Sequence, residues 1–136
     1  MSNQSAGSQG RPATLVSLLR SRAAEQGGKT AFAFLTDGEV EGERLTYAGL
    51  AGRAQAIAAA LCESLAPGDR ALLLYPPGLE FIAAFFGCLA AGVIAVPAYP
   101  PRRSDRSQER LRAIARDAAP RAALTTAAIR GAFATS

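Results

Sequence analysis

The sequence of 136 residues has no histidine, no tryptophan, two cysteines and a single lysine. Without histidine there is no imidazole to act as a general base, and no catalytic triad that depends on one. Two cysteines, Cys62 and Cys88, are too few for a disulfide framework or a four-cysteine zinc site. Each cysteine lies in an apolar helical pattern, which predicts two buried free thiols.

Hydrophobic residues make up 49% of the chain, which excludes a wholly disordered protein. The length allows one domain, able to bury roughly 68% of the surface exposed on unfolding. Residues 1–12 are rich in Ser, Gln and Gly and show no secretory signal. We therefore expect a disordered leader (1–12), one folded unit (13–136) and a cytoplasmic location.

The formal net charge of +4 is concentrated near the C-terminus. Eight arginines and three acidic residues fall between Arg102 and Arg130. A basic segment of this kind could contact a phosphate backbone, but it lacks the interleaved aromatic residues of many nucleic-acid sites. We interpret it as the solvated face of a helix and expect no nucleic-acid partner.

One uncharged stretch, from Phe81 to Ala98, reaches the length of a membrane span. Pro97 interrupts it, Ala and Gly make up much of it, and β-branched residues begin after Gly92. These features favour a buried helix followed by a buried strand. A single-span membrane protein remains the less favoured alternative.

The first half of the chain predicts a helix, a hairpin and a second, longer helix. Thr14 is a candidate cap for the first helix, with Leu15, Leu18 and Leu19 on one face. Strands at 31–35 and 43–46 flank an Asp37-Gly38 turn. Thr46 then caps an amphipathic helix whose apolar stripe comprises Leu50, Ala54, Ile57, Ala58, Leu61 and Leu65.

The second half alternates strands and helices. Strands are expected near 71–75, 93–96 and 122–125, with helices at 79–91 and 108–118 between them. This pattern predicts an α/β fold with a parallel βαβαβ unit. Small residues such as Gly87 should let the first of these helices pack closely on the sheet. In the second, Leu111, Ile114, Ala115 and Ala118 form the expected core face, whereas Arg110, Arg112 and Arg116 lie off it. Thr125 or Thr126 is a candidate cap for a further helical start.

Local chemistry identifies no catalytic, cofactor-binding or metal-binding residue. Gly28-Lys29-Thr30 resembles the end of a P-loop, but Ala23 occupies the position of the required first glycine. Gly28 is interpreted as a helix stop. Glu39, Glu41 and Glu43 alternate through the expected hairpin, as a solvated face would.

Several motifs together resemble the N-terminal part of fatty acyl-AMP ligases, within the adenylate-forming enzymes. They are Leu45-Thr46-Tyr47, Pro67-Gly68-Asp69-Arg70, the stretch from Tyr75-Pro76-Pro77-Gly78 to Gly92, and Pro97-Ala98-Tyr99-Pro100-Pro101-Arg102. The last is the most specific for the acyl-AMP ligases, and the resemblance covers roughly residues 14–126.

The resemblance implies an enzyme that condenses a fatty acid with Mg-ATP to form an acyl-adenylate and pyrophosphate. The acyl group would pass to an acyl carrier protein, often at the start of a polyketide or lipopeptide assembly line. The family's phosphate-binding loop, metal-binding Glu and catalytic Lys would lie beyond Ser136. Residues 13–136 are therefore expected to be an incomplete, inactive N-terminal part of the AMP-binding domain that does not bind ATP tightly.

No site residue is transferred from the family to this sequence. Tyr75, Tyr99 and Arg102 occupy motif positions, and we expect them to be scaffold. The main alternative function is a small independent α/β module that docks a carrier protein through its arginine face.

Overall fold

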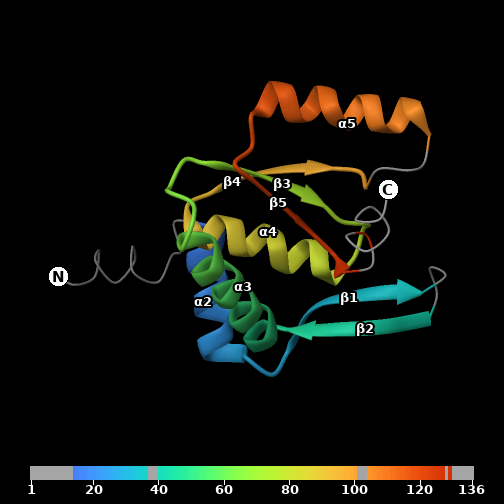
Figure 1. The fold of residues 1–136 in the computed structure, drawn as a ribbon. Coiled ribbons are helices and arrows are strands. Elements are labelled where there is room, and N and C mark those ends of the chain that lie inside the picture. The colour runs from blue at the N-terminus through green and yellow to red at the C-terminus, as the bar shows by residue number, and fades with distance from the viewer. Residues whose placement is uncertain (1–13, 37–39, 101–103, 128, 130–136) are drawn as a thin grey trace.

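The computed structural model describes residues 14–36, 40–100, 104–127 and 129 (Figure 1). The elements in chain order are α2 (Leu15–Gln26), β1 (Thr30–Thr36), β2 (Val40–Thr46), α3 (Tyr47–Cys62), β3 (Arg70–Leu74), α4 (Leu79–Ala91), β4 (Ile94–Ala98), α5 (Asp105–Ala118) and β5 (Ala122–Thr125). Every helix and strand expected from the sequence is present, with changes at some ends.

Strands β3, β4 and β5 form a parallel sheet in the order β4-β3-β5. Leu72, at the centre of β3, lies opposite Val96 of β4 and Ala123 of β5. The first crossover runs from β3 to β4, and the second runs back from β4 past β3 to β5, so the two cross the sheet in opposite directions. Right-handed connections of that kind place their helices on opposite faces. Figure 1 shows α4 and α5 on opposite sides of the sheet. The predicted α/β fold with a parallel βαβαβ unit is confirmed.

The main core lies between the sheet and helix α4. Leu73 and Cys88 are fully buried there, and Val93 is buried beside them. Leu61 of helix α3 and Leu65 of the turn between α3 and β3 belong to the same core. Helix α4 is therefore covered by the sheet on one side and by α3 on another. This explains why α4 is apolar around nearly its whole circumference.

A second apolar cluster joins helices α2, α3 and α4 to the hairpin β1–β2. Leu19, Leu45, Leu50 and Leu79 are buried in it. The two predicted caps are confirmed: the hydroxyl oxygen of Thr14 accepts a hydrogen bond from the Ser17 amide, and that of Thr46 from the Gly49 amide, each at 3.0 Å. These caps fix where α2 and α3 begin.

Several predicted element ends are wrong. Strand β2 begins at Val40 and not at residue 43. Helix α3 ends at Cys62, so Leu65 is buried from the following turn and not from the helix. Strand β4 runs from Ile94 to Ala98 and includes Pro97, which is compatible with a strand at the sheet's edge. Helix α5 begins at Asp105, three residues earlier than expected, because the Ser104 hydroxyl caps the Ser107 amide.

Several burial predictions are also wrong. Cys62 is exposed, since it lies one residue past Leu61 and is rotated about 100° from the buried stripe. Leu15 and Leu18 are exposed, and only Leu19 of that expected face is buried. The apolar face of α5 contains no buried residue, although its arginines 110, 112 and 116 are exposed as expected.

The expected leader (1–12), the Asp37-Gly38 turn and Arg102 lie outside the described residues. Within the described part of the chain, no helix is both long enough and apolar enough to cross a membrane. The stretch from Phe81 to Ala98 is divided between α4 and β4, as the favoured interpretation predicted. The expectation that the strand is buried is wrong, because no residue of β4 is buried and Ile94 is 48% exposed.

Candidate functional site

The carboxyl ends of the three parallel strands meet at one edge of the sheet. The chain leaves β3 toward α4 and leaves β4 toward α5, on opposite faces (Figure 1). In open α/β sheets, ligands bind outside the carboxyl ends at the point where connections diverge in this way. The candidate site therefore lies at the carboxyl ends of β3 and β4, where Tyr75, Tyr99 and their flanking prolines follow the strands.

The two tyrosines of this edge have different environments. Tyr75 follows β3 and packs partly against the main core, whereas Tyr99 follows β4 and is 81% exposed. Burial raises the pKa of Tyr75, and the charge of Glu80 raises it further. Tyr75 is thus a neutral phenol at physiological pH, able to donate a hydrogen bond. The scaffold role expected for both residues stays a prediction.

Thr125 is the last residue of β5, which lies on the other side of β3 from β4. Its hydroxyl donates a hydrogen bond of 2.8 Å to the Leu74 carbonyl at the end of β3. The next residue, Thr126, caps the helical start by accepting from the Ile129 amide at 3.1 Å. The sequence predicted one of these threonines as a cap, but it did not reveal the cross-strand bond of Thr125. That bond joins residues 51 positions apart, so no local pattern signals it.

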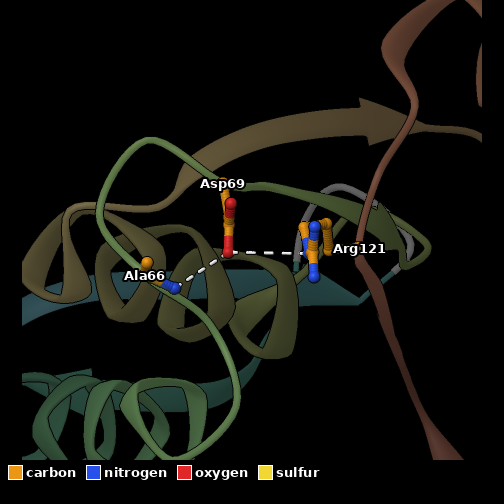
Figure 2. A network of polar contacts seen from close by, with 3 residues as sticks. All are labelled: Ala66, Asp69 and Arg121. Atoms are coloured by element: carbon orange, nitrogen blue, oxygen red, sulfur yellow. Dashed lines mark hydrogen bonds and ion pairs between the residues drawn. The ribbon is translucent and has the colours of Figure 1, made fainter.

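The motif Pro67-Gly68-Asp69-Arg70 lies at the opposite, amino-terminal edge of the sheet (Figure 2). The Asp69 carboxylate accepts a hydrogen bond of 2.8 Å from the Ala66 amide and lies 3.8 Å from the Arg121 guanidinium. The Arg70 guanidinium donates to the Ala118 carbonyl at the end of α5, at 2.9 Å. Together, these contacts tie the start of β3 to the segment that enters β5.

Backbone hydrogen bonds complete this arrangement at the amino ends. The Asp69 carbonyl accepts from the Ile94 amide, and the Arg70 carbonyl accepts from the Arg121 amide, each at 2.8 Å. Gly68, with φ +91°, adopts the left-handed conformation that the turn requires. The motif therefore holds three strands in register, which is a structural role distant from the candidate site.

Gly28-Lys29-Thr30 does not form a P-loop in the structure. Lys29 is exposed between the end of α2 and Thr30, which opens a strand and not a helix. A P-loop requires a strand before the loop and a helix after it. No group of three acidic or cysteine side chains that could hold a metal occurs among residues 14–36, 40–100, 104–127 and 129.

Comparison with known proteins places the chain in a family. Residues 19–135 match the family described as "AMP-binding enzyme". The chain therefore belongs to the AMP-binding enzyme family, and its fold is the N-terminal part of an adenylate-forming enzyme.

The sequence relatives are fatty-acid-activating ligases. The chain is 50% identical over 107 residues to the medium-chain-fatty-acid–[acyl-carrier-protein] ligase JamA of Moorena producens, covering 77% of this chain and 18% of the relative. It is 40% identical over 121 residues to the long-chain-fatty-acid–AMP ligase FadD26 of Mycobacterium marinum, covering 87% and 20%.

Solved structures agree with these relatives. The fatty acid AMP ligase from Legionella pneumophila has a TM-score of 0.82 and 42% identity, covering 88% of this chain and 21% of that one. The chain thus spans about a fifth of the length of the proteins that it matches. The predicted resemblance to fatty acyl-AMP ligases is confirmed.

Proposed function

We propose that this chain is part of an enzyme that activates a fatty acid with Mg-ATP and loads it onto an acyl carrier protein. The observation that carries the proposal is the 42% identity, over 88% of the chain, to the Legionella pneumophila fatty acid AMP ligase. The acyl carrier is supported by JamA, whose name specifies ligation to an acyl carrier protein.

The chemistry proceeds in two group transfers. A carboxylate oxygen of the fatty acid bonds to the α-phosphorus of ATP, and the bond to pyrophosphate breaks. The carrier's thiol then adds to the acyl carbonyl, and AMP departs with the electron pair of the broken bond. Such catalysis depends on positioning and on stabilisation of the phosphate charge.

The described residues contribute scaffold to this reaction. The sheet edge at Tyr75 and Tyr99 would border the reaction site, while Asp69 and Arg70 hold the strands from the other end. Because Gly28-Lys29-Thr30 does not form a P-loop and the chain spans about a fifth of its relatives' length, we expect the 136-residue chain alone to neither bind ATP tightly nor form acyl-adenylate.

The test replaces the matching segment of the Legionella pneumophila ligase with residues 14–129 of this chain. We expect ATP–pyrophosphate exchange that depends on added fatty acid in the chimera, and background exchange in the isolated chain. A folded chimera without fatty-acid-dependent exchange would contradict the proposal. Exchange by the isolated chain above background would refute its expected inactivity.

A further inference from the structure

Helix α5 carries four arginines on the side that is turned away from the sheet. Arg106, Arg110, Arg112 and Arg116 are all exposed, whereas the apolar residues of the opposite side are partly buried. No other helix of the described chain lies on this side of the sheet (Figure 1). We call these four residues the arginine face.

The spacing of the arginines does not serve the helix itself. Arg106 and Arg110 are four residues apart, as are Arg112 and Arg116, so the members of each pair are neighbours on the helix surface. Like charges at this spacing destabilise an isolated helix. At a rise of about 1.5 Å per residue the face is roughly 15 Å long, which about three turns of another helix would cover.

The chain does not neutralise these charges. Within the described residues, none of the four guanidinium groups forms an ion pair or a hydrogen bond, whereas Arg121, beyond the helix, lies 3.8 Å from Asp69. Glu109 is the only acidic residue between the first and the last of the four arginines, which leaves that segment with a net charge of +3, and Asp105 and Asp117 flank it. The arginine face therefore attracts a surface that presents carboxylates.

The arginine face begins beside the candidate site. The chain leaves β4 through Tyr99 and enters α5 at the same edge of the sheet, so Arg106 lies near the carboxyl ends of the strands (Figure 1). The other end of the helix returns to the amino ends, where the Ala118 carbonyl accepts from Arg70. A partner docked on α5 would therefore sit next to the edge that holds the candidate site.

We propose that the arginine face is the docking surface for an acidic helix of the acyl carrier protein. The inference rests on the proposed function, in which a carrier brings its thiol to the candidate site. Nucleic acid fits the face less well, because the helix has no aromatic residue on which a base could stack. An anionic membrane also fits less well, since the apolar side of α5 is turned toward the sheet and not toward lipid.

The experiment measures activation, loading and binding separately. Residues 14–129 replace the matching segment of JamA, and the probe is an acyl carrier protein that is a substrate of JamA. Fatty-acid-dependent ATP–pyrophosphate exchange reports activation, and the KM for the carrier reports loading. Fluorescence anisotropy of the labelled carrier measures its binding to the full 136-residue chain at low and high salt.

Three variants are compared in both proteins. Arg106→Gln/Arg110→Gln removes two positive charges from the arginine face, and Glu109→Gln removes its one negative charge. Arg20→Gln/Arg22→Gln is the matched control, because it removes two exposed arginines from α2 and changes the net charge equally.

We expect Arg106→Gln/Arg110→Gln to raise the KM for the carrier, and to weaken binding, by roughly tenfold at low salt, because each exposed ion pair contributes a few-fold. High salt should shrink this difference. Glu109→Gln should act in the opposite direction by roughly twofold, since its carboxylate repels an acidic partner. The α2 control should change neither quantity, and the effects should be confined to the carrier step because exchange does not involve the carrier.

Equal losses in the α2 control would overturn the inference, because net charge alone would then explain them. An unchanged KM and unchanged binding in Arg106→Gln/Arg110→Gln would also overturn it. Tighter arginine-dependent binding of single-stranded RNA or of anionic lipid vesicles would assign the face to another polyanion and would overturn it as well. If the chimera lacks exchange but the 136-residue chain binds the carrier through these arginines, the inference stands and the proposed function alone is contradicted.

Discussion

Asp69 is the residue with the clearest individual role, because its carboxylate joins the turn before β3 to the segment before β5. We predict that Asp69→Ala lowers the free energy of unfolding by about 1–2 kcal/mol, mainly through loss of the bond to the Ala66 amide. Arg121→Ala should cost less than about 0.5 kcal/mol, since that side chain is 69% exposed and 3.8 Å away.

Urea unfolding of the isolated chain measures both changes. Asp69→Asn is the informative control, because its side-chain oxygen can still accept from the Ala66 amide while the charge is lost. It should resemble the unsubstituted chain more than Asp69→Ala does. A loss in Arg121→Ala as large as that in Asp69→Ala would show that the ion pair, and not the hydrogen bond, dominates.

The two cysteines should differ in reactivity. Cys62 is exposed, whereas Cys88 is fully buried and burial raises its pKa to about 11. We predict that an alkylating reagent at pH 8 modifies Cys62 in the folded chain and reaches Cys88 only on unfolding. Mass spectrometry of digested protein distinguishes the two, and Cys62→Ser is the control that should remove the fast reaction.

The same pKa shift makes stability depend on alkaline pH. The folded pKa of Cys88 lies above the ordinary thiol value of 9.0, so its contribution is complete below about pH 9 and is lost as the pH rises toward about 11. The loss should be smaller in Cys88→Ala, which keeps the raised pKa of Tyr75 as a second source of alkaline destabilisation. An equally steep alkaline decline in that variant would assign the effect to other groups.

Sequence reasoning succeeded at residues whose role is local. The caps at Thr14 and Thr46 act within three positions of themselves, so their sequence context is sufficient to identify them. It failed for Cys62, because the exposure of this residue depends on where the buried stripe of α3 ends, whereas Cys88 is buried as predicted. No local sequence pattern predicts the ion pair of Asp69 with Arg121 or the hydrogen bond of Thr125 to Leu74, because the partners are far apart in the sequence.

At the scale of elements, the closest packing lies between helices α3 and α4. A Cβ atom built on Gly87 of α4 would lie 2.7 Å from Cβ of Ile57 on α3. The sequence correctly indicated close packing by the small residues of α4, but it assigned Gly87 to the sheet. Periodicity identifies an apolar helix, and it cannot say which neighbour meets each side of it.

Gly87→Ala should therefore lower the free energy of unfolding, although alanine normally stabilises a helix interior by about 1 kcal/mol relative to glycine. Gly52→Ala in α3 is the matched control, because nothing lies within 4 Å of its added Cβ, and it should stabilise the chain. Ile57→Ala should reduce the penalty of Gly87→Ala in the double variant. If Gly87→Ala and Gly52→Ala changed the free energy of unfolding in the same direction, the result would contradict the close contact between Gly87 and Ile57.

The strands and helices of the second half were predictable because short apolar runs alternate with helical patterns. Helix α5 was the exception, since its apolar stripe predicted a core face that the described chain leaves partly open. The sequence encodes amphipathicity, but it does not encode how much of an apolar face the other elements cover. The same reason accounts for the exposure of Ile94 in β4.

At the scale of the whole molecule, the family was predictable and the reaction site was not. The motifs at Asp69 and Tyr99 lie at opposite ends of the sheet, so they identify the fold and not a set of reacting groups. The chain spans about a fifth of its relatives' length, and Gly28-Lys29-Thr30 does not form a P-loop. This explains why fold and family agree while no catalytic side chain is assigned.

The parallel order of β4, β3 and β5 is the central structural claim, because the candidate site is defined by the carboxyl ends of these strands. Nuclear Overhauser contacts between backbone protons of the isotopically labelled chain test it directly. We predict contacts from Leu72 to both Val96 and Ala123, in the pattern of parallel strands. Contacts between facing α-protons of antiparallel strands, or a continuous helical pattern from Phe81 through Ala98, would contradict the account.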